Sequence, residues 1–119
     1  MLIYKYIINI DFEKKNMYVC LPVGAEAISM IYEDMDKAYV YALVDPLEKR
    51  KERREVLWIG TGCELERDKV NKIKSTYQFL GTYTWNDLVY HFWIEPETWD
   101  LNRIFVDSIE LDQPMEESV

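Results

Sequence analysis

The side chains that could act on a substrate are few and far apart in the sequence. His91 is the only histidine, and Cys20 and Cys63 are the only cysteines. A Cys63–His91 pair could act as nucleophile and base, but the fold would have to bring two distant segments together. No spacing of these residues matches a zinc site. A single histidine on a strand is most often a hydrogen-bonded structural residue. We therefore predict no catalytic residue, metal site or cofactor.

Two further motifs are candidates for binding a small anion. Gly60-Thr61-Gly62 resembles part of a phosphate loop but lacks the trailing Gly-Lys-Ser/Thr, which favours a turn at the end of a strand. The basic run from Lys49 to Arg54 could hold an anion if it folds back beside aromatic side chains. The candidate residues for such a ligand, for instance a nucleotide signal, are Arg50, Arg53, Arg54, Tyr90 and Trp93.

The C-terminal segment, residues 96–119, combines acidic and large apolar side chains. It holds seven acids and one arginine. A disordered tail would not need so many apolar groups, whereas an arm that docks on its own domain or on a partner would. The predicted partner-binding residues are Glu97, Trp99, Asp100, Asp107, Glu110 and Asp112.

The charge of the chain is uneven. The net charge is −8, and residues 48–74 hold 9 basic and 6 acidic side chains, whereas residues 75–119 hold 1 basic and 9 acidic. Nucleic-acid binding needs positive charge along the phosphates, so we expect no direct nucleic-acid contact. No apolar run is long enough to span a membrane, and the N-terminus lacks the features of a signal peptide. These features predict a cytoplasmic protein with reduced cysteines.

Alternating apolar residues and turn signals predict the elements that position these side chains. The most regular pattern is a hairpin in which Asn86-Asp87 forms the turn between strands 75–85 and 88–95. The second strand is expected to be central and covered on both faces, as is the strand at 38–44. The remaining predicted elements are strands at 2–11, 17–21, 26–32 and 56–60, with the first two forming a meander, and a short amphipathic helix at 64–74.

The predicted fold is mainly β, within the α+β class. Seven or eight short strands linked by hairpins, with one short helix, predict a small antiparallel sheet, a sandwich or a part-closed barrel. The polar run 47–55 is expected to be a solvated loop or a helical turn. Residues 1–95 form the single predicted domain, and residues 96–119 form the acidic arm, with one more strand or a docked segment before a disordered end at 113–119.

Several short motifs, in the same order, resemble a family of small uncharacterised proteins of tailed phages and prophages. The likeness covers about residues 2–95, but Cys63 stands where the family commonly has histidine. The resemblance implies a small β-rich protein made in the cytoplasm of the host during infection, and it implies no chemistry. The motifs are Ile3-Tyr4-Lys5-Tyr6, Leu21-Pro22-Val23-Gly24-Ala25, Tyr41-Ala42-Leu43-Val44-Asp45-Pro46, Ile59-Gly60-Thr61-Gly62, and Leu80-Gly81-Thr82 followed by Leu88-Val89-Tyr90-His91-Phe92.

The function expected from these features is non-enzymatic. We expect a phage protein that binds and inhibits a host protein, as an anti-CRISPR protein does, through an acidic surface that meets a basic, nucleic-acid-binding surface of the target. The alternatives are a sponge for a small anionic nucleotide signal and a small hydrolase that uses His91. The sequence leaves open whether the protein forms a homodimer.

Overall fold

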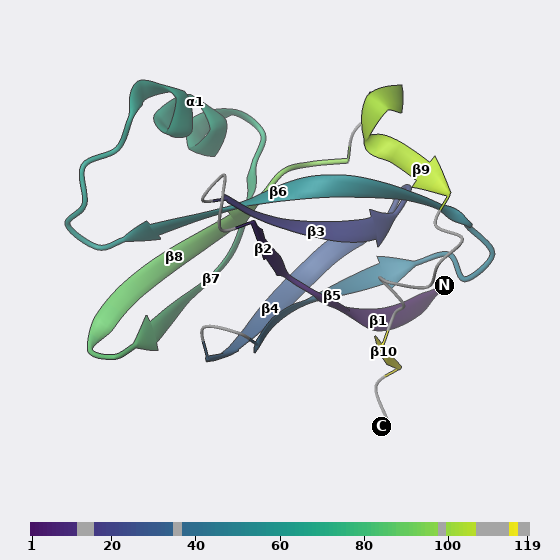
Figure 1. Ribbon diagram of the computed structural model, residues 1–119, viewed down its shortest axis with the longest axis horizontal. Helices are drawn as coiled ribbons and strands as arrows, with labels where there is room; N and C mark the ends of the chain where they lie inside the picture. The colour runs from purple at the N-terminus through teal and green to yellow at the C-terminus, as the bar shows by residue number, and fades with distance from the viewer. Residues whose placement is uncertain (12–15, 35–36, 98–99, 107–114, 117–119) are drawn as a thin grey trace.

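The structure, a computed structural model, describes residues 1–11, 16–34, 37–97, 100–106 and 115–116. Two antiparallel sheets face each other across one core, and a single short α-helix lies at one end (Figure 1). The sheets do not close into a barrel. The predicted class, a mainly β fold with antiparallel sheets and one short helix, is confirmed, and the alternative that the structure adopts is the sandwich.

The first sheet has the strand order β10, β1, β5, β4. These strands are Met115–Glu116, Leu2–Ile7, Lys37–Val44 and Glu26–Asp34. Alternate residues of β5 are buried against the second sheet, whereas Tyr39, Tyr41 and Leu43 on its outer face are half-buried. The expectation that this strand is buried on both faces was therefore wrong, because nothing among the described residues covers its outer face fully.

The second sheet has the order β2, β3, β6, β8, β7, and β9 also pairs with β6. Its strands are Asn9–Asp11, Asn16–Pro22, Arg50–Gly60, Leu88–Ile94, Gln78–Trp85 and Ile104–Val106. The helix α1, Arg67–Ser75, lies between β6 and β7 in the chain and confirms the predicted amphipathic helix. A 3-10 turn, η1 at Leu101–Arg103, leads into β9.

The N-terminal segment changes sheet at Ile8. β1 pairs with β5 in one sheet, whereas β2 pairs with β3 in the other. At the change, the Ile8 N–H donates to the Ala38 carbonyl at 2.8 Å and the Ile8 side chain is buried. The first predicted strand is therefore two strands, and only its second part forms a hairpin with β3. Alternation continues through the break, so the sequence pattern gave no sign of it.

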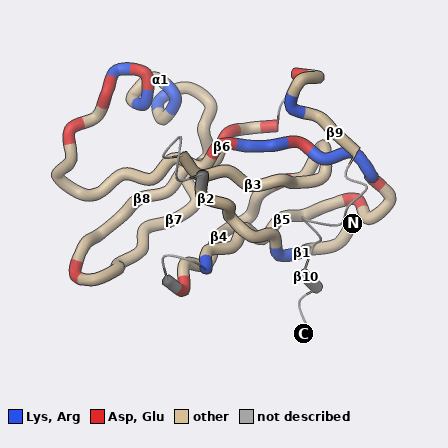
Figure 2. The backbone as a smooth tube through the Cα atoms, viewed as in Figure 1, with Lys and Arg blue, Asp and Glu red and all other residues tan. Residues whose placement is uncertain are grey.

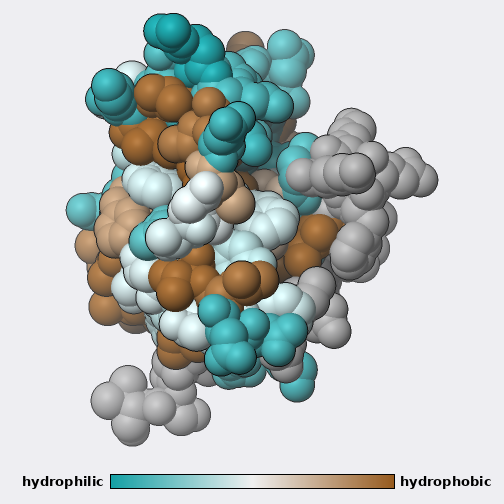
Figure 3. Space-filling model, turned by 90° about the vertical axis from the view of Figure 1, so that its left-hand side faces the viewer, coloured by the Kyte–Doolittle hydropathy of each residue, from teal (hydrophilic) through white to brown (hydrophobic). Residues whose placement is uncertain are grey.

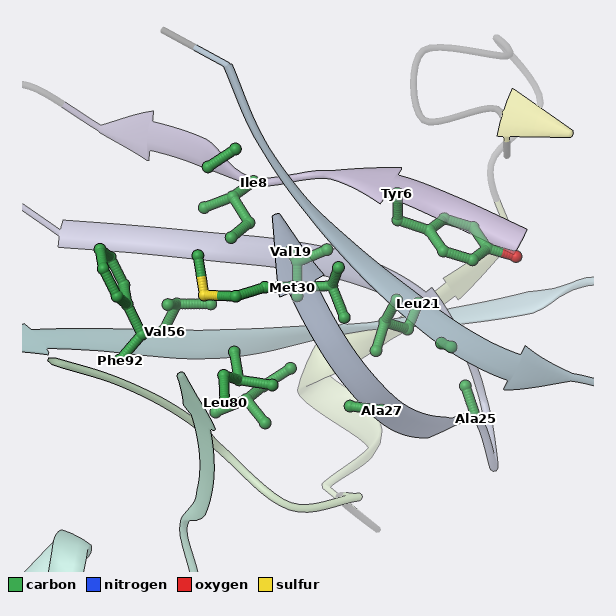
Figure 4. Close-up of a cluster of buried hydrophobic side chains, with 14 of the residues drawn as sticks. Tyr6, Ile8, Val19, Leu21, Ala25, Ala27, Met30, Val56, Leu80 and Phe92 are labelled. Carbon is green, nitrogen blue, oxygen red and sulfur yellow. The ribbon is translucent and has the colours of Figure 1, made fainter. Parts of the chain in front are cut away.

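The core lies between the facing sheets. Inward side chains of β1, β4 and β5 meet those of β3, β6 and β8 in one buried cluster (Figure 4). Phe92, Leu21 and Ile94 are its largest fully buried apolar side chains. Each such side chain contributes about 1.5–3 kcal/mol of transfer free energy, so this cluster is the main stabilising feature of the domain.

The basic run departs most from its prediction. It was expected to be a solvated loop or a helical turn, but Arg50 to Glu55 form the first half of β6, the strand at the centre of the second sheet. Glu52 and Arg54 are buried, with 0% and 3% of their surface exposed. They face inward because the side chains of a strand alternate, and opposite charges two residues apart neutralise each other there.

The predicted hairpin is confirmed. Asn86 and Asp87 have φ values of 53° and 65°, the left-handed conformation that a two-residue turn of this type requires. β8 is central, since β6 and β7 flank it. It is not covered on both sides, however, because Val89 on its outer face remains exposed. That exposure makes the hairpin part of the molecular surface.

Candidate functional site

His91 lies on the outer face of β8 between two threonine hydroxyls. Its Nε2 is 2.7 Å from Thr61 Oγ1, and its Nδ1 is 3.0 Å from Thr82 Oγ1. Both ring nitrogens are thus occupied by neutral partners from neighbouring segments. Neither of these partners is a carboxylate that could orient a catalytic base. This geometry matches a structural histidine that joins the end of β6 to β7 and β8.

The replacement His91→Gln tests this role. We expect the free energy of unfolding to fall by about 0.5–2 kcal/mol, because glutamine cannot reach both hydroxyls from one planar group. Urea denaturation measures the change. A variant with the wild-type denaturation midpoint would contradict the structural role, and loss of a measured activity at an unchanged midpoint would support a hydrolase.

The predicted C-terminal binding residues are only partly described. Trp99, Asp107, Glu110 and Asp112 lie outside the described residues. Glu97 is exposed, and Asp100 caps η1 by accepting a bond from the Asn102 N–H at 3.0 Å. Beyond η1, β9 adds to the second sheet beside Arg50–Glu52, and β10 pairs with β1. Residues 104–106 and 115–116 are therefore parts of the sheets.

The three arginines proposed to bind an anion point in different directions. The Arg54 Nε donates to Glu52 Oε1 at 2.7 Å inside the core. Arg50 lies at the exposed start of β6, where its bonds lower the pKa of Glu48 to about 2. Arg53 lines a pocket, and its guanidinium lies 3.3 Å from the centre of the Tyr18 ring. The arginines therefore do not converge on one ligand.

The two aromatic candidates also lie apart, on opposite faces of β8. Tyr90 is on the inner side, with its ring centre 5.5 Å from that of Trp58. Trp93 is on the outer side, in edge contact with Phe79 at 5.5 Å. Since neither aromatic residue lines the pocket that Arg53 faces, the structure does not bring the five proposed ligand residues together.

The pocket beside Arg53 has a volume of about 270 Å³ and is built mainly from charged groups. Glu55 Oε1 accepts bonds from Lys72 Nζ at 2.9 Å and from the Tyr77 hydroxyl at 2.8 Å. Burial, with the bond to Glu55, raises the pKa of Tyr77 far above its usual value of 10. Glu95 accepts from the Glu55 N–H and pairs with Arg103. This network ties α1, β6 and η1 together, and sequence reasoning missed it because its members are distant in the chain.

The β7–β8 hairpin, residues 78–94, exposes apolar groups and has almost no charge. Asp87 is its only residue with a formal charge, whereas β6 and α1 carry many (Figure 2). On its outer side, Phe79 is 52% and Val89 is 36% exposed. We call Phe79, Val89, His91 and Trp93 the outer aromatic face. An apolar surface of this kind on a highly charged protein indicates an interaction site.

Other kinds of site are not found among the described residues. No group of three or more histidine, cysteine or acidic side chains there could hold a metal ion. No helix in that part of the chain is long and apolar enough to cross a membrane. Cys20 is buried and Cys63 is exposed, and neither forms a disulfide.

Comparison with known proteins yields one match. The family described as Domain of unknown function (DUF7352) matches residues 1–101. No curated protein and no solved structure matches the chain. The match extends past Glu95, where the predicted domain ends, and includes η1 only in part.

Proposed function

The chain belongs to the DUF7352 family, whose description assigns no function, and we propose that it is a non-enzymatic protein that binds a partner protein. The observation that carries this proposal is the outer aromatic face. Tryptophan and tyrosine anchors in apolar surroundings dominate the binding energy of many interfaces, and charged groups are depleted at the centres of such interfaces. The face carries Trp93 and no residue with a formal charge, and the two strands of the hairpin pair along their length.

We further propose that the partner is a host protein and that binding inhibits it, as expected for an anti-CRISPR-like protein acting in the cytoplasm of an infected cell. The resemblance to phage and prophage proteins supports the setting. The net charge of −8 supports a partner with a basic, nucleic-acid-binding surface, because opposite charges accelerate the encounter. Aromatic contacts would then hold the complex, while the acids would guide it into place.

The two alternatives have less support. A small anion could bind beside Arg53 and Tyr18, but the pocket already holds two carboxylates, Glu55 and Glu95, and the other proposed ligand residues are elsewhere. A hydrolase would need His91 to act as a base, although both of its ring nitrogens face threonine hydroxyls. A thermal-shift screen with cyclic nucleotides tests the first alternative, and a rise in melting temperature that Arg53→Gln removes would favour it.

The proposed function is tested with a photo-crosslinking amino acid at position 79 in host cells. We expect one host protein to be crosslinked at this position, because Phe79 lies in the exposed face. The matched control is position 47, since Leu47 is also an exposed apolar residue but lies in the turn before β6. With the purified target, the double variant Phe79→Ser/Val89→Thr should weaken binding at least tenfold, as expected when interface anchors are lost.

A second measurement separates steering from contact. Raising the salt concentration should lower the association rate more than it raises the dissociation rate, because charges are screened beyond about 8 Å at physiological salt. Equal binding by the double variant and the wild type would contradict the role of the outer aromatic face. A target crosslinked equally well at positions 47 and 79 would contradict it as well.

A further inference from the structure

One edge of β6 is unpaired beyond the start of β3, within the part of the chain that the structure describes. β3 pairs with β6 from Pro22↔Lys51 to Met17↔Val56, and β6 then continues to Gly60. On its other side, this part of β6 pairs with β8, from Leu57↔Trp93 to Gly60↔Tyr90. Residues 57–60 therefore have a strand on one side only, among the residues that the structure describes.

The backbone hydrogen bonds show which groups face the open edge. The Glu55 carbonyl accepts from the Glu95 N–H, and the Thr61 N–H donates to the Val89 carbonyl, both at 2.9 Å. Successive residues of a strand direct their N–H and C=O groups to opposite sides. The backbone N–H and C=O groups of Leu57 and Ile59 therefore point toward β8, and those of Trp58 point away from it, toward the open edge. The N–H of Gly60 also points to the edge, while its carbonyl accepts from Cys63.

A groove of about 410 Å³ runs beside this edge. Trp58 and Leu65, in its walls, are 44% and 42% exposed. Figure 3 shows apolar groups gathered at this end of the molecule, below the hydrophilic residues at the top of the picture, where α1 lies. Lys69 adds one positive charge to the lining, and Glu55 and Glu64 add two negative charges. The groove thus combines a backbone donor and acceptor at Trp58 with apolar walls.

We propose that an extended peptide segment of a partner protein binds in this groove as an added strand beside residues 57–60. This inference rests on the proposed protein-binding function and names the form of the partner. Addition of a strand to a free sheet edge is a common mode of peptide recognition, in which backbone bonds provide affinity and alternate side chains provide specificity. The N–H and C=O of Trp58 have no strand partner in the described part of the chain, and an extended backbone opposite them would bond to both.

The groove also defines the side chains of the peptide. One set of alternate residues would lie with Trp58 and Tyr90, and these positions favour apolar side chains. The other set would lie with Leu57 and Leu65, and these positions favour apolar side chains as well. The loop after β6 and α1 flank the edge, so the groove accepts a single narrow segment better than the edge of a second folded copy.

The open edge is first tested by amide hydrogen exchange on the full chain. The amides of Trp58 and Gly60 should exchange roughly 100-fold faster than those of Leu57 and Ile59, which bond to β8. Equal protection of all four amides would mean that the edge is already paired, and it would overturn the proposal before any ligand is tried.

Binding is tested with a displayed library of random heptapeptides selected against the full chain. Selected peptides should show alternating apolar residues. When they are resynthesised, methylation of the alternate backbone nitrogens, those that face β6, should abolish binding. Methylation of the intervening nitrogens should change the affinity less than about threefold. Peptides that tolerate methylation at every position would overturn the proposal, because their backbone would not join the sheet.

Two variants at one position separate side chain from backbone. Trp58→Thr keeps the N–H and should weaken peptide binding about tenfold, whereas Trp58→Pro removes the N–H and should abolish it. Because the Trp58 N–H points away from β8, proline at this position removes no hydrogen bond between β6 and β8. If both variants bind alike, the proposal is wrong. If no peptide binds while crosslinking at position 79 still finds its target, the proposed function stands and the proposed binding at the strand edge is wrong. Dimerisation that depends on concentration and is abolished by Trp58→Pro would instead assign the edge to a second copy of the chain.

Discussion

The variant Glu52→Gln should lose about 3–5 kcal/mol of its free energy of unfolding, because it leaves Arg54 charged and buried without a counterion. The side chain of Glu52 is fully buried, and its Oε1 accepts from Arg54 Nε at 2.7 Å. Arg54 also donates to the Ala25 carbonyl at 2.7 Å, so the pair fixes the turn before β4 to the centre of β6. A neutral glutamine keeps the shape but removes the charge.

Urea denaturation of three variants tests this prediction. Glu48→Gln removes the partner of Arg50 at the exposed start of β6 and should leave the midpoint close to that of the wild type, because water screens that pair. The double variant Glu52→Leu/Arg54→Met should recover most of the loss, since an apolar pair of similar volume carries no desolvation cost. A midpoint of Glu52→Gln equal to that of Glu48→Gln would show that the buried pair contributes little.

Local patterns in the sequence predicted the elements better than their partners. The Asn86-Asp87 turn and the helix after Cys63 follow from residue preferences that act over a few positions, and both are present. The change of sheet at Ile8 depends on which distant strand each half meets. Alternation is the same before and after this residue, so no local signal could reveal it.

The basic run shows a different reason for failure. Its polarity suggested a loop, yet its alternation is that of a strand continuous with Val56. A signal was available, since Glu52 and Arg54 are opposite charges at a spacing of two and can neutralise each other on one face. Judging polarity residue by residue hides such a pair. Polar segments beside an apolar strand should therefore be checked for charges that cancel on the inward face.

The candidate site was the least predictable part. The residues of the outer aromatic face can be read in the sequence as part of the hairpin, but the sequence does not show that Phe79 and Val89 remain exposed while His91 and Trp93 are half-buried. Among the described residues, the open edge at residues 57–60 arises because β6 continues past its pair Met17↔Val56 with β3, and this appears only when the strands are paired. The acidic arm had the clearest compositional signal, and most of its predicted binding residues lie outside the described part.

Ending the chain after Pro96 should lower the free energy of unfolding by about 2–4 kcal/mol while leaving both sheets folded. The truncation removes β9, which pairs with Arg50–Glu52, and the two-residue β10, which pairs with β1. The backbone groups of this part of β6 then turn to water, at a net cost of about 1 kcal/mol for each hydrogen bond lost. Ile104 lies directly opposite Glu52 on the inward side, so its loss also admits water to the buried pair.

A comparison of the truncation with Arg103→Gln identifies the cause of the loss. Arg103 pairs with Glu95, but the pair is partly exposed, so this variant should lose at most about 1 kcal/mol. Combining the truncation with Glu52→Leu/Arg54→Met should cost less than the sum of the separate effects, because no buried charge remains for water to reach. Strict additivity, or a truncated chain with the wild-type midpoint, would mean that β9 does not shield the pair. If β9 shields the pair, the C-terminal arm both carries the proposed acidic contacts and protects Glu52 and Arg54 from water. Truncation can then test the role of the arm in binding only after the change in stability has been measured.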